Sequence, residues 1–269
     1  MKCKIFMDAC VLVAASTFYM SDDLNLRLEH AFYQQSMSLV TFIRKNISGR
    51  IGIITKTIER QSTPALQNAI DEEISKVGID RERDFPTYSF IKNYCEQKLK
   101  NISSYFVREP IDEDAVKSNY GYVDKLYAEK AKEAIKLAFI EPRFEQQTKQ
   151  ASKRFQGVAK WVYKQQQRKE DYQLTNLIKK PVEPSDKWIL AEAIYLSMLY
   201  DTIENEEVVF FIASTDHHFS PKRWGREIMS AQVSEAIQKK FKIIPDWPQQ
   251  VENMANGVLQ GKYPSFYTK

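Results

Sequence analysis

The apolar run Val-Val-Phe-Phe-Ile-Ala at residues 208–213 decides the fold class. A continuous apolar run without polar alternation is typical of a strand that is covered on both faces, as in a parallel sheet. Helical patterns flank this run, one at 185–200 before it and one at about 225–240 after it. Parallel strands need such crossover helices between them. The run and its flanks therefore predict an α/β protein.

Three further segments carry strand patterns. Residues 3–8 predict a short first strand that ends in Asp8, and residues 51–57 predict a second strand because they are rich in β-branched side chains. Residues 242–244 predict a last strand before Pro245. The N-terminal and C-terminal parts of the chain thus both alternate strands with helices, which indicates one sheet built from both.

Helices are expected between these strands. Apolar positions at roughly helical spacing predict a helix within 22–46, and Thr63 followed by Pro64 predicts the start of another that stops at Gly78. Residues 86–183 show little strand signal, and 122–140 place their apolar side chains on one helical face. We therefore expect a domain interrupted by a helical insertion, with the chain divided into 1–85, 86–183 and 184–269.

Composition fits a cytoplasmic globular protein. Hydrophobic residues make up 43% of the 269 residues, which is enough for a core, and the three cysteines form no disulfide framework. Lys2 and Lys4 before an apolar stretch resemble a signal peptide, but Asp8 interrupts the stretch, and the apolar run 9–15 is too short to cross a bilayer. No membrane association is expected.

Four acids carry the functional prediction. Asp8 and Asp216 follow expected strands, Glu59 follows the second one, and Asp186 opens a helix. Sites in open α/β sheets form outside the carboxyl ends of the strands, so these acids are expected to gather there. Gathered carboxylates repel one another, and a bound cation relieves that repulsion. Ligation by oxygen alone selects Mg²⁺ or Mn²⁺.

Each acid also has a structural explanation when it is taken singly. Asp186 can stabilise a helix N-terminus, Asp8 or Asp216 can bind a turn backbone, and Glu59 can be a solvated surface acid. Their joint placement is what favours a site.

Four motifs containing these acids resemble those of PIN-domain nucleases. They are Ile5–Leu12 with Asp8, Ile53–Glu59, Ser185–Ala191 with Asp186, and Ile212–Phe219 with Asp216. The resemblance implies a three-layer α/β/α sandwich and Mg²⁺- or Mn²⁺-dependent cleavage of phosphodiesters, usually in RNA. It assigns all four acids as catalytic metal ligands, Glu59 directly or through water, and it has Thr215 bind a phosphate or a neighbouring carboxylate.

Two features depart from the family pattern. His218 occupies a place where many members carry a second acid, and the stretch between Glu59 and Asp186 is much longer than in the compact members. Many members are ribonuclease toxins of toxin–antitoxin pairs and others process RNA. The long stretch speaks against the small-toxin assignment. Whether the protein binds an antitoxin or another protein partner, or forms a homodimer, is left open by the sequence.

A basic block precedes an acidic one. Residues 141–180 hold ten Lys and Arg against four acids, whereas 181–219 hold one Lys against eight acids. In the basic block, Lys153, Lys160 and Lys164 recur along one helical face and could contact RNA phosphates without reading sequence. The alternative for this block is a solvated helix face.

Two other functions compete with the nuclease. One is a non-catalytic PIN-like module that binds RNA or a protein partner; intact acids at all four motif positions favour the enzyme over it. The other is a Rossmann-like phosphatase of the Asp-x-Asp kind, against which Cys10 counts, since it stands where that motif needs its second Asp.

Overall fold

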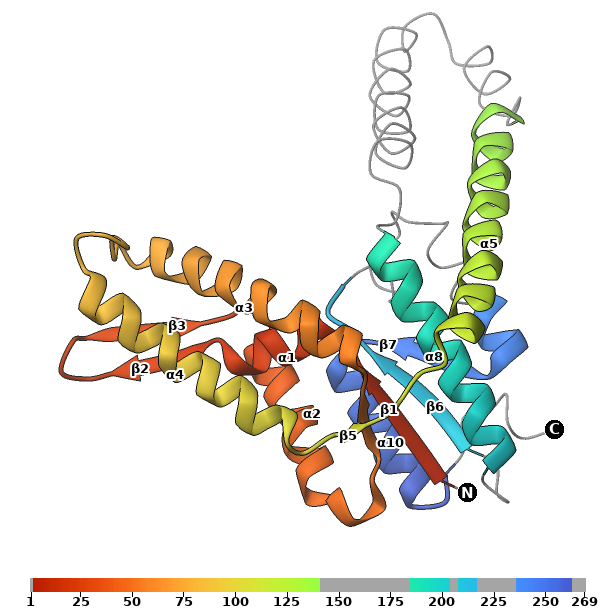
Figure 1. Ribbon diagram of the computed structural model, residues 1–269, viewed down its shortest axis with the longest axis horizontal. Helices are drawn as coiled ribbons and strands as arrows, with labels where there is room; N and C mark the ends of the chain where they lie inside the picture. Colours follow the sequence, from red (N-terminus) through yellow and green to blue (C-terminus); the bar gives the residue numbers. More distant parts are fainter. Residues whose placement is uncertain (1, 141–183, 204–207, 217–235, 263–269) are drawn as a thin grey trace, which may run out of the picture.

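A five-stranded parallel sheet forms the centre of the computed structural model, which describes residues 2–140, 184–203, 208–216 and 236–262 (Figure 1). The strand order is β5-β4-β1-β6-β7, and every pairing is parallel. The α/β prediction is therefore confirmed. The strands are β1 (Lys2–Met7), β4 (Gly52–Ile54), β5 (Val107–Arg108), β6 (Val208–Ala213) and β7 (Ile243–Asp246).

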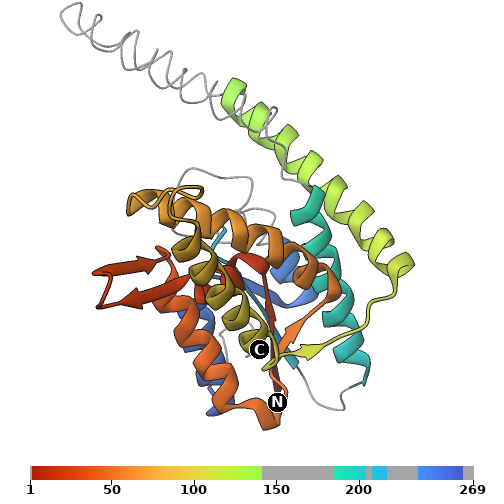
Figure 2. The same cartoon turned by 60° about the vertical axis from the view of Figure 1, so that its left-hand side comes forward.

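Helices cover both faces of this sheet. Helix α10 packs on β1 and β6 and against α2, whereas α8 packs on β6 and β7 with α5 outside it. Figure 2 shows the sheet between these two groups, as expected for an α/β/α arrangement. The main helices are α1 (Ala9–Ser16), α2 (Tyr33–Lys45), α3 (Lys56–Lys76), α4 (Phe85–Ser103), α5 (Glu113–Ile140), α8 (Pro184–Ile203) and α10 (Pro248–Leu259).

The strand order reverses in the middle of the sheet. From central β1 the chain moves outward to β4 and β5 on one side, and it then returns to β6 and β7 on the other side. The reversal lies between β1 and β6. Open α/β sheets bind their ligands outside the carboxyl ends of the strands at such a point, because the connecting helices lie on opposite faces there.

The two strands at the reversal are the most deeply buried. All six residues of β6 are buried, and so is β1 from Cys3 to Met7. Phe6, Phe210 and Phe211 rank among the largest fully buried side chains. Each such ring contributes about 1.5–3 kcal/mol by leaving water. This burial holds the ends of β1 and β6 in fixed register, with Met7 opposite Ala213.

The helix expected within 22–46 starts later than predicted. A hairpin of β2 (Phe18–Ser21) and β3 (Leu26–Glu29) occupies its first part, and the helix begins only at Tyr33. Leu26 and Leu28 are both buried, so their spacing of two residues belongs to a strand and not to a helix. The turn between the strands contains Asn25 in the left-handed region, with φ of 46°.

The start predicted at Thr63 and Pro64 is also wrong. Helix α3 begins at Lys56, so the second strand covers only Gly52–Ile54 and Pro64 lies inside the helix. Thr55 is the N-cap, and its hydroxyl accepts the Ile58 N–H. An internal proline costs a helix roughly 3 kcal/mol, and the buried apolar face of α3 offsets that cost.

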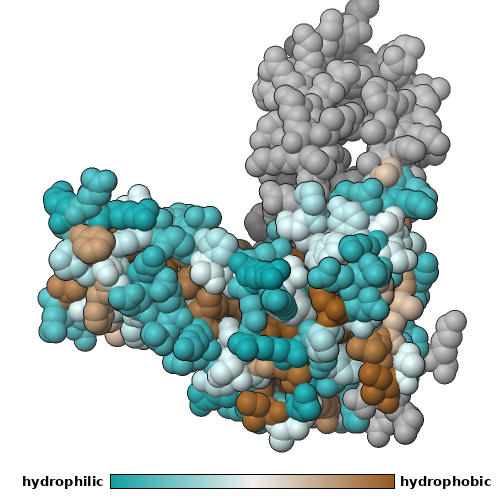
Figure 3. All heavy atoms as spheres, viewed as in Figure 1, coloured by the Kyte–Doolittle hydropathy of each residue, from teal (hydrophilic) through white to brown (hydrophobic). Residues whose placement is uncertain are grey.

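Helices α3 and α4 and the β2–β3 hairpin form an arm that projects from the sheet (Figure 1). Tyr19 of the hairpin packs edge-on against Phe90 and Tyr94 of α4. Figure 3 shows mostly hydrophilic side chains over the arm, with hydrophobic ones between them. Strand β5 follows the arm and pairs with β4, so part of the expected insertion 86–183 belongs to the sheet.

Residues 141–183, which include the whole expected basic block, lie outside the described residues. Among the helices that the structure describes, none is long and apolar enough to cross a membrane.

Candidate active site at the carboxyl edge of the sheet

Asp8 lies at the carboxyl end of the central strand, beside the reversal of strand order. It follows Met7 of β1 directly and precedes α1 as its N-cap, with extended backbone. Its backbone N–H donates to the Ala213 carbonyl at the end of β6, at 3.0 Å. The residue is 5% exposed. The sequence thus places an acid at the position where this fold type binds ligands.

A compact polar network surrounds the Asp8 carboxylate. Its Oδ2 accepts from the Ser214 hydroxyl at 2.6 Å and from the Cys10 thiol at 2.9 Å. The Ser214 Oγ in turn accepts the Asp216 N–H at 3.0 Å, and the Cys10 Sγ accepts the Thr215 N–H at 3.2 Å. Two short segments, one after β1 and one after β6, are therefore joined through side chains.

The electrostatics of Asp8 make its charge unfavourable as the site stands. Burial raises the pKa of the Asp8 carboxyl above its usual value, and the hydrogen bonds from Cys10 and Ser214 lower it in part. The neighbouring Asp216 carboxylate raises the pKa of Asp8 again by like-charge repulsion. Burial and the Asp8 charge likewise raise the pKa of the Cys10 thiol, so this thiol is a neutral donor at neutral pH.

Asp216 and Thr215 occupy the loop just after β6. Both are partly exposed, and Asp216 is close enough to Asp8 for their charges to interact. We expected Thr215 to contact a phosphate or a neighbouring carboxylate. The residue whose hydroxyl meets Asp8 is Ser214, one position earlier, while Thr215 contributes its backbone N–H to Cys10. A phosphate contact by Thr215 stays a prediction.

The other two predicted ligands lie on helices. Glu59 is in the first turn of α3, where its carboxylate pairs with the Arg108 guanidinium of β5 at 2.6 Å. Asp186 is in the first turn of α8 and partly buried. Within the described part of the chain, no three His, Cys, Asp or Glu side chains lie close enough together to hold a metal ion. The convergence of all four acids therefore stays a prediction.

A fully buried acid that we did not select, Glu192, lies in the middle of α8. Its carboxylate accepts from the Thr55 hydroxyl at 2.6 Å, the Thr57 hydroxyl at 2.5 Å and the Trp188 indole N–H at 2.8 Å. Burial raises the pKa of Glu192, and these three donors offset part of the rise. Thr55 directly follows β4, so this second network reaches the same edge of the sheet as Asp8.

Signals for the overlooked residues were present in the sequence. Glu192 stands alone in the apolar run Ile189–Ile194, and a charge on the buried face of a helix requires partners. Cys10 lies two residues after Asp8, within reach of the strand end, although we assigned it no role in the site. Ser214 carried no signal beyond its place in the motif.

The donor set suits a hard divalent cation. Asp8 and Asp216 are two carboxylates that repel each other at the strand ends. Mg²⁺ is commonly held by one or two carboxylates, with water and substrate phosphate completing its octahedron. Mg²⁺ or Mn²⁺ thus fits these two residues chemically and would relieve their repulsion. The neutral thiol of Cys10 adds no ligand to that set.

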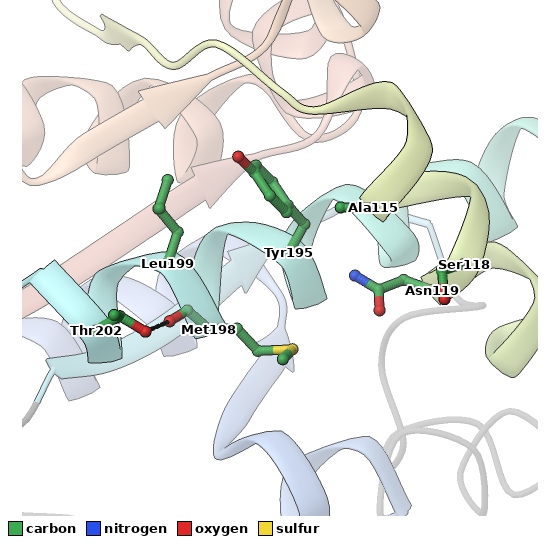
Figure 4. Close-up of a pocket in the computed structure, with 7 residues that line it drawn as sticks. All are labelled: Ala115, Ser118, Asn119, Tyr195, Met198, Leu199 and Thr202. Carbon is green, nitrogen blue, oxygen red and sulfur yellow. Dashed lines mark hydrogen bonds between the residues drawn. The ribbon is translucent and has the colours of Figure 1, made fainter.

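A shallow hollow elsewhere on the molecule contains none of the predicted site residues. It lies between the start of α5 and the second half of α8, where Asn119 faces Tyr195 and Met198 (Figure 4). The Thr202 hydroxyl at its end donates to the Met198 carbonyl at 2.9 Å (Figure 4). The hollow has no titratable cluster among its lining residues, so the carboxyl edge is the better candidate site.

The predicted RNA contacts Lys153, Lys160 and Lys164 lie outside the described residues. No family model, curated protein or solved structure matches the chain.

Proposed function

We propose that the protein is a Mg²⁺- or Mn²⁺-dependent phosphodiesterase, and that it is a ribonuclease of the PIN type. The observation that supports this most is the pair Asp8 and Asp216, two interacting carboxylates that flank the reversal of strand order. A buried acid opposed by a second acid is costly without a cation between them. The order of the four acidic motifs along the chain supports the narrower assignment.

The protein's own residues have distinct roles in this proposal. Asp8 and Asp216 would hold the cation, which supplies an activated water and neutralises charge on the phosphate. Ser214 fixes the orientation of the Asp8 carboxylate through its hydroxyl. Asp186 and Glu59 are the further candidate ligands. Lys153, Lys160 and Lys164 would bind the phosphate backbone of the RNA. The substrate would be an RNA of the cytoplasm.

Cleavage of a labelled RNA of mixed sequence by the purified protein tests this function. We expect cleavage with Mg²⁺ or Mn²⁺, none in excess EDTA, and a fall of at least about 10²-fold in Asp8→Asn, because metal catalysis supplies several kcal/mol. Asp71→Asn in the arm, whose carboxylate binds Tyr88 and Gln67, is the matched control and should retain full activity. Full activity in Asp8→Asn, or in EDTA, would contradict the proposal.

One observation favours a second candidate, a non-catalytic PIN-like module that binds RNA or a protein partner. The Glu59 carboxylate is already paired with Arg108, so it is neutralised within the protein. Under this alternative the chain would bind RNA with equal affinity in EDTA and in Mn²⁺, and it would not cleave it. Arg108→Gln would then leave RNA cleavage absent, whereas in the nuclease it should leave cleavage measurable.

A further inference from the structure

Glu192 connects three elements at the edge that carries Asp8. Its carboxylate on α8 accepts from Thr55, which directly follows β4 and caps α3, and from Thr57, which lies in the first turn of α3. Trp188, one turn earlier on α8, completes the set of donors. Among the described residues, Asp8 is the other buried acid that binds donors from two separate segments of the chain.

The register of the sheet brings this network next to Asp8. Phe6 of β1 lies opposite Ile53 of β4, so Asp8 and Thr55 each stand two residues beyond a matched pair. Neighbouring strands are about 4.8 Å apart, which makes Thr55 the lateral neighbour of Asp8. Ser214 holds the equivalent position on the other side, beyond the matched pair Met7 and Ala213. Asp8 is therefore flanked by two hydroxyl residues, and Glu192 fixes one of them.

The same network fixes both helices that carry the remaining candidate ligands. Glu59 lies two residues after Thr57 on α3, within the same helical turn. Asp186 lies six residues before Glu192 on α8, about 9 Å along the helix axis. The Glu192 carboxylate accepts from Thr55 and Thr57, so it fixes the first turn of α3 against the middle of α8, the helix that begins with Asp186 in its first turn.

We infer that Glu192 is a positioning residue, which clamps the first turn of α3 to α8 beside Asp8 and so sets the geometry in which the edge acids take a divalent cation. The inference rests on the proposed function. The three donors occupy the Glu192 oxygens, and the residue is 0% exposed, so it acts through its neighbours and does not touch the cation.

The Thr57 hydroxyl allows a matched test. Thr57→Val removes this hydroxyl while keeping the β-branched shape, and Thr57→Ser restores it. Glu192→Gln keeps the shape but places an NH₂ group where one oxygen accepts. The measurement is the Kd of Mn²⁺ from the electron paramagnetic resonance signal of free Mn²⁺, on protein held well below its Tm. Tyr88→Phe, which removes a hydroxyl bond to Asp71 in the arm, is the control.

We expect the Mn²⁺ Kd to rise about 10-fold or more in Glu192→Gln and Thr57→Val, the range seen when partners that orient metal ligands are removed. Thr57→Ser and Tyr88→Phe should keep the wild-type Kd. An unchanged Kd in Glu192→Gln and Thr57→Val, with only a lower Tm, would overturn the inference and leave Glu192 a structural residue. A wild-type protein that binds no Mn²⁺ would overturn the proposed function itself, and this inference with it.

Discussion

Two buried carboxylates at the same edge of the sheet differ in what surrounds them. Glu192 accepts from three neutral donors, whereas Asp8 accepts from two side-chain donors and faces the charge of Asp216. Burial raises the pKa of both. The difference lies in the neighbours. Hydrogen-bond donors surround the Glu192 carboxylate, whereas the Asp8 carboxylate is also repelled by the carboxylate of Asp216.

This contrast separates two uses of a buried acid. A carboxylate whose oxygens are occupied by donors holds elements of the fold together, and removing it leaves those donors unpaired. A carboxylate that faces a second one stores repulsion that a cation can relieve. Glu192 is therefore expected to matter most for stability and positioning, and Asp8 most for metal binding and cleavage.

The largest expected effect is on folding stability at Glu192. Glu192→Ala leaves the buried Thr55 hydroxyl and the partly buried Thr57 hydroxyl and Trp188 indole N–H without their acceptor, which should lower the free energy of unfolding by about 3 kcal/mol. Asp8→Asn should leave the free energy of unfolding unchanged or raise it, because it removes repulsion with Asp216. Urea unfolding at neutral pH with EDTA checks both, and equal losses in the two variants would erase the contrast.

Divalent cations should stabilise the protein through Asp8. At a Mn²⁺ concentration of 100 times Kd, binding to the native state alone adds about 2.7 kcal/mol, which corresponds to a rise of several degrees in Tm. Asp8→Asn should show no such rise. Thermal unfolding with and without Mn²⁺ measures this, and a Tm that rises as much in Asp8→Asn would place the bound cation elsewhere.

The fold could be predicted from the sequence where a segment is apolar throughout or carries its apolar side chains on one face of a helix. Residues 208–213 are apolar throughout and became β6, and Ile189, Leu190 and Ile194 became the buried face of α8. Leu24 and Leu28 misled us, because their spacing of four residues fits one face of a helix, whereas in the hairpin Leu28 is buried and Leu24 is exposed. Only the tertiary packing of the hairpin against α4 decides between them.

The site could be predicted in part. Asp8 and Asp216 interact because each follows an apolar strand, and the two strands, β1 and β6, are parallel neighbours whose carboxyl ends lie side by side. Glu192 was missed because its partners Thr55 and Thr57 lie far away along the chain, and pairing of that kind depends on the sheet register. The ion pair of Glu59 with Arg108 was missed for the same reason, since β5 gave no strand signal.

A smaller effect is expected at Ser214, which orients Asp8. Ser214→Ala removes its bond to Asp8 and the acceptor for the Asp216 N–H, so the free energy of unfolding should fall by about 1 kcal/mol. The Kd of Mn²⁺ should rise roughly 10-fold, since a partner of the ligand is lost. Calorimetric titration checks the Kd. An unchanged Kd would mean that the Asp8 orientation does not depend on Ser214.

The smallest effect concerns pH. The pKa of Glu192 is raised by burial above its usual 4.5, so the native state holds this proton more tightly than the unfolded chain. Its contribution to stability is full below about pH 4.5 and is lost as pH rises through the native pKa. Wild type should therefore lose stability relative to Glu192→Gln over that range. Urea unfolding of both proteins at several pH values measures the difference, and a constant difference would contradict it.

Anomalous scattering from a crystal grown with Mn²⁺ shows whether Asp8 and Asp216 share one divalent cation. We expect one strong peak between the two carboxylates, about 2.0–2.2 Å from an oxygen of each, as hard divalent ions require. The same crystal form of Asp8→Asn should lack this peak. A peak that contacts neither acid, or no peak at this edge at saturating Mn²⁺, would mean that the two acids share no cation.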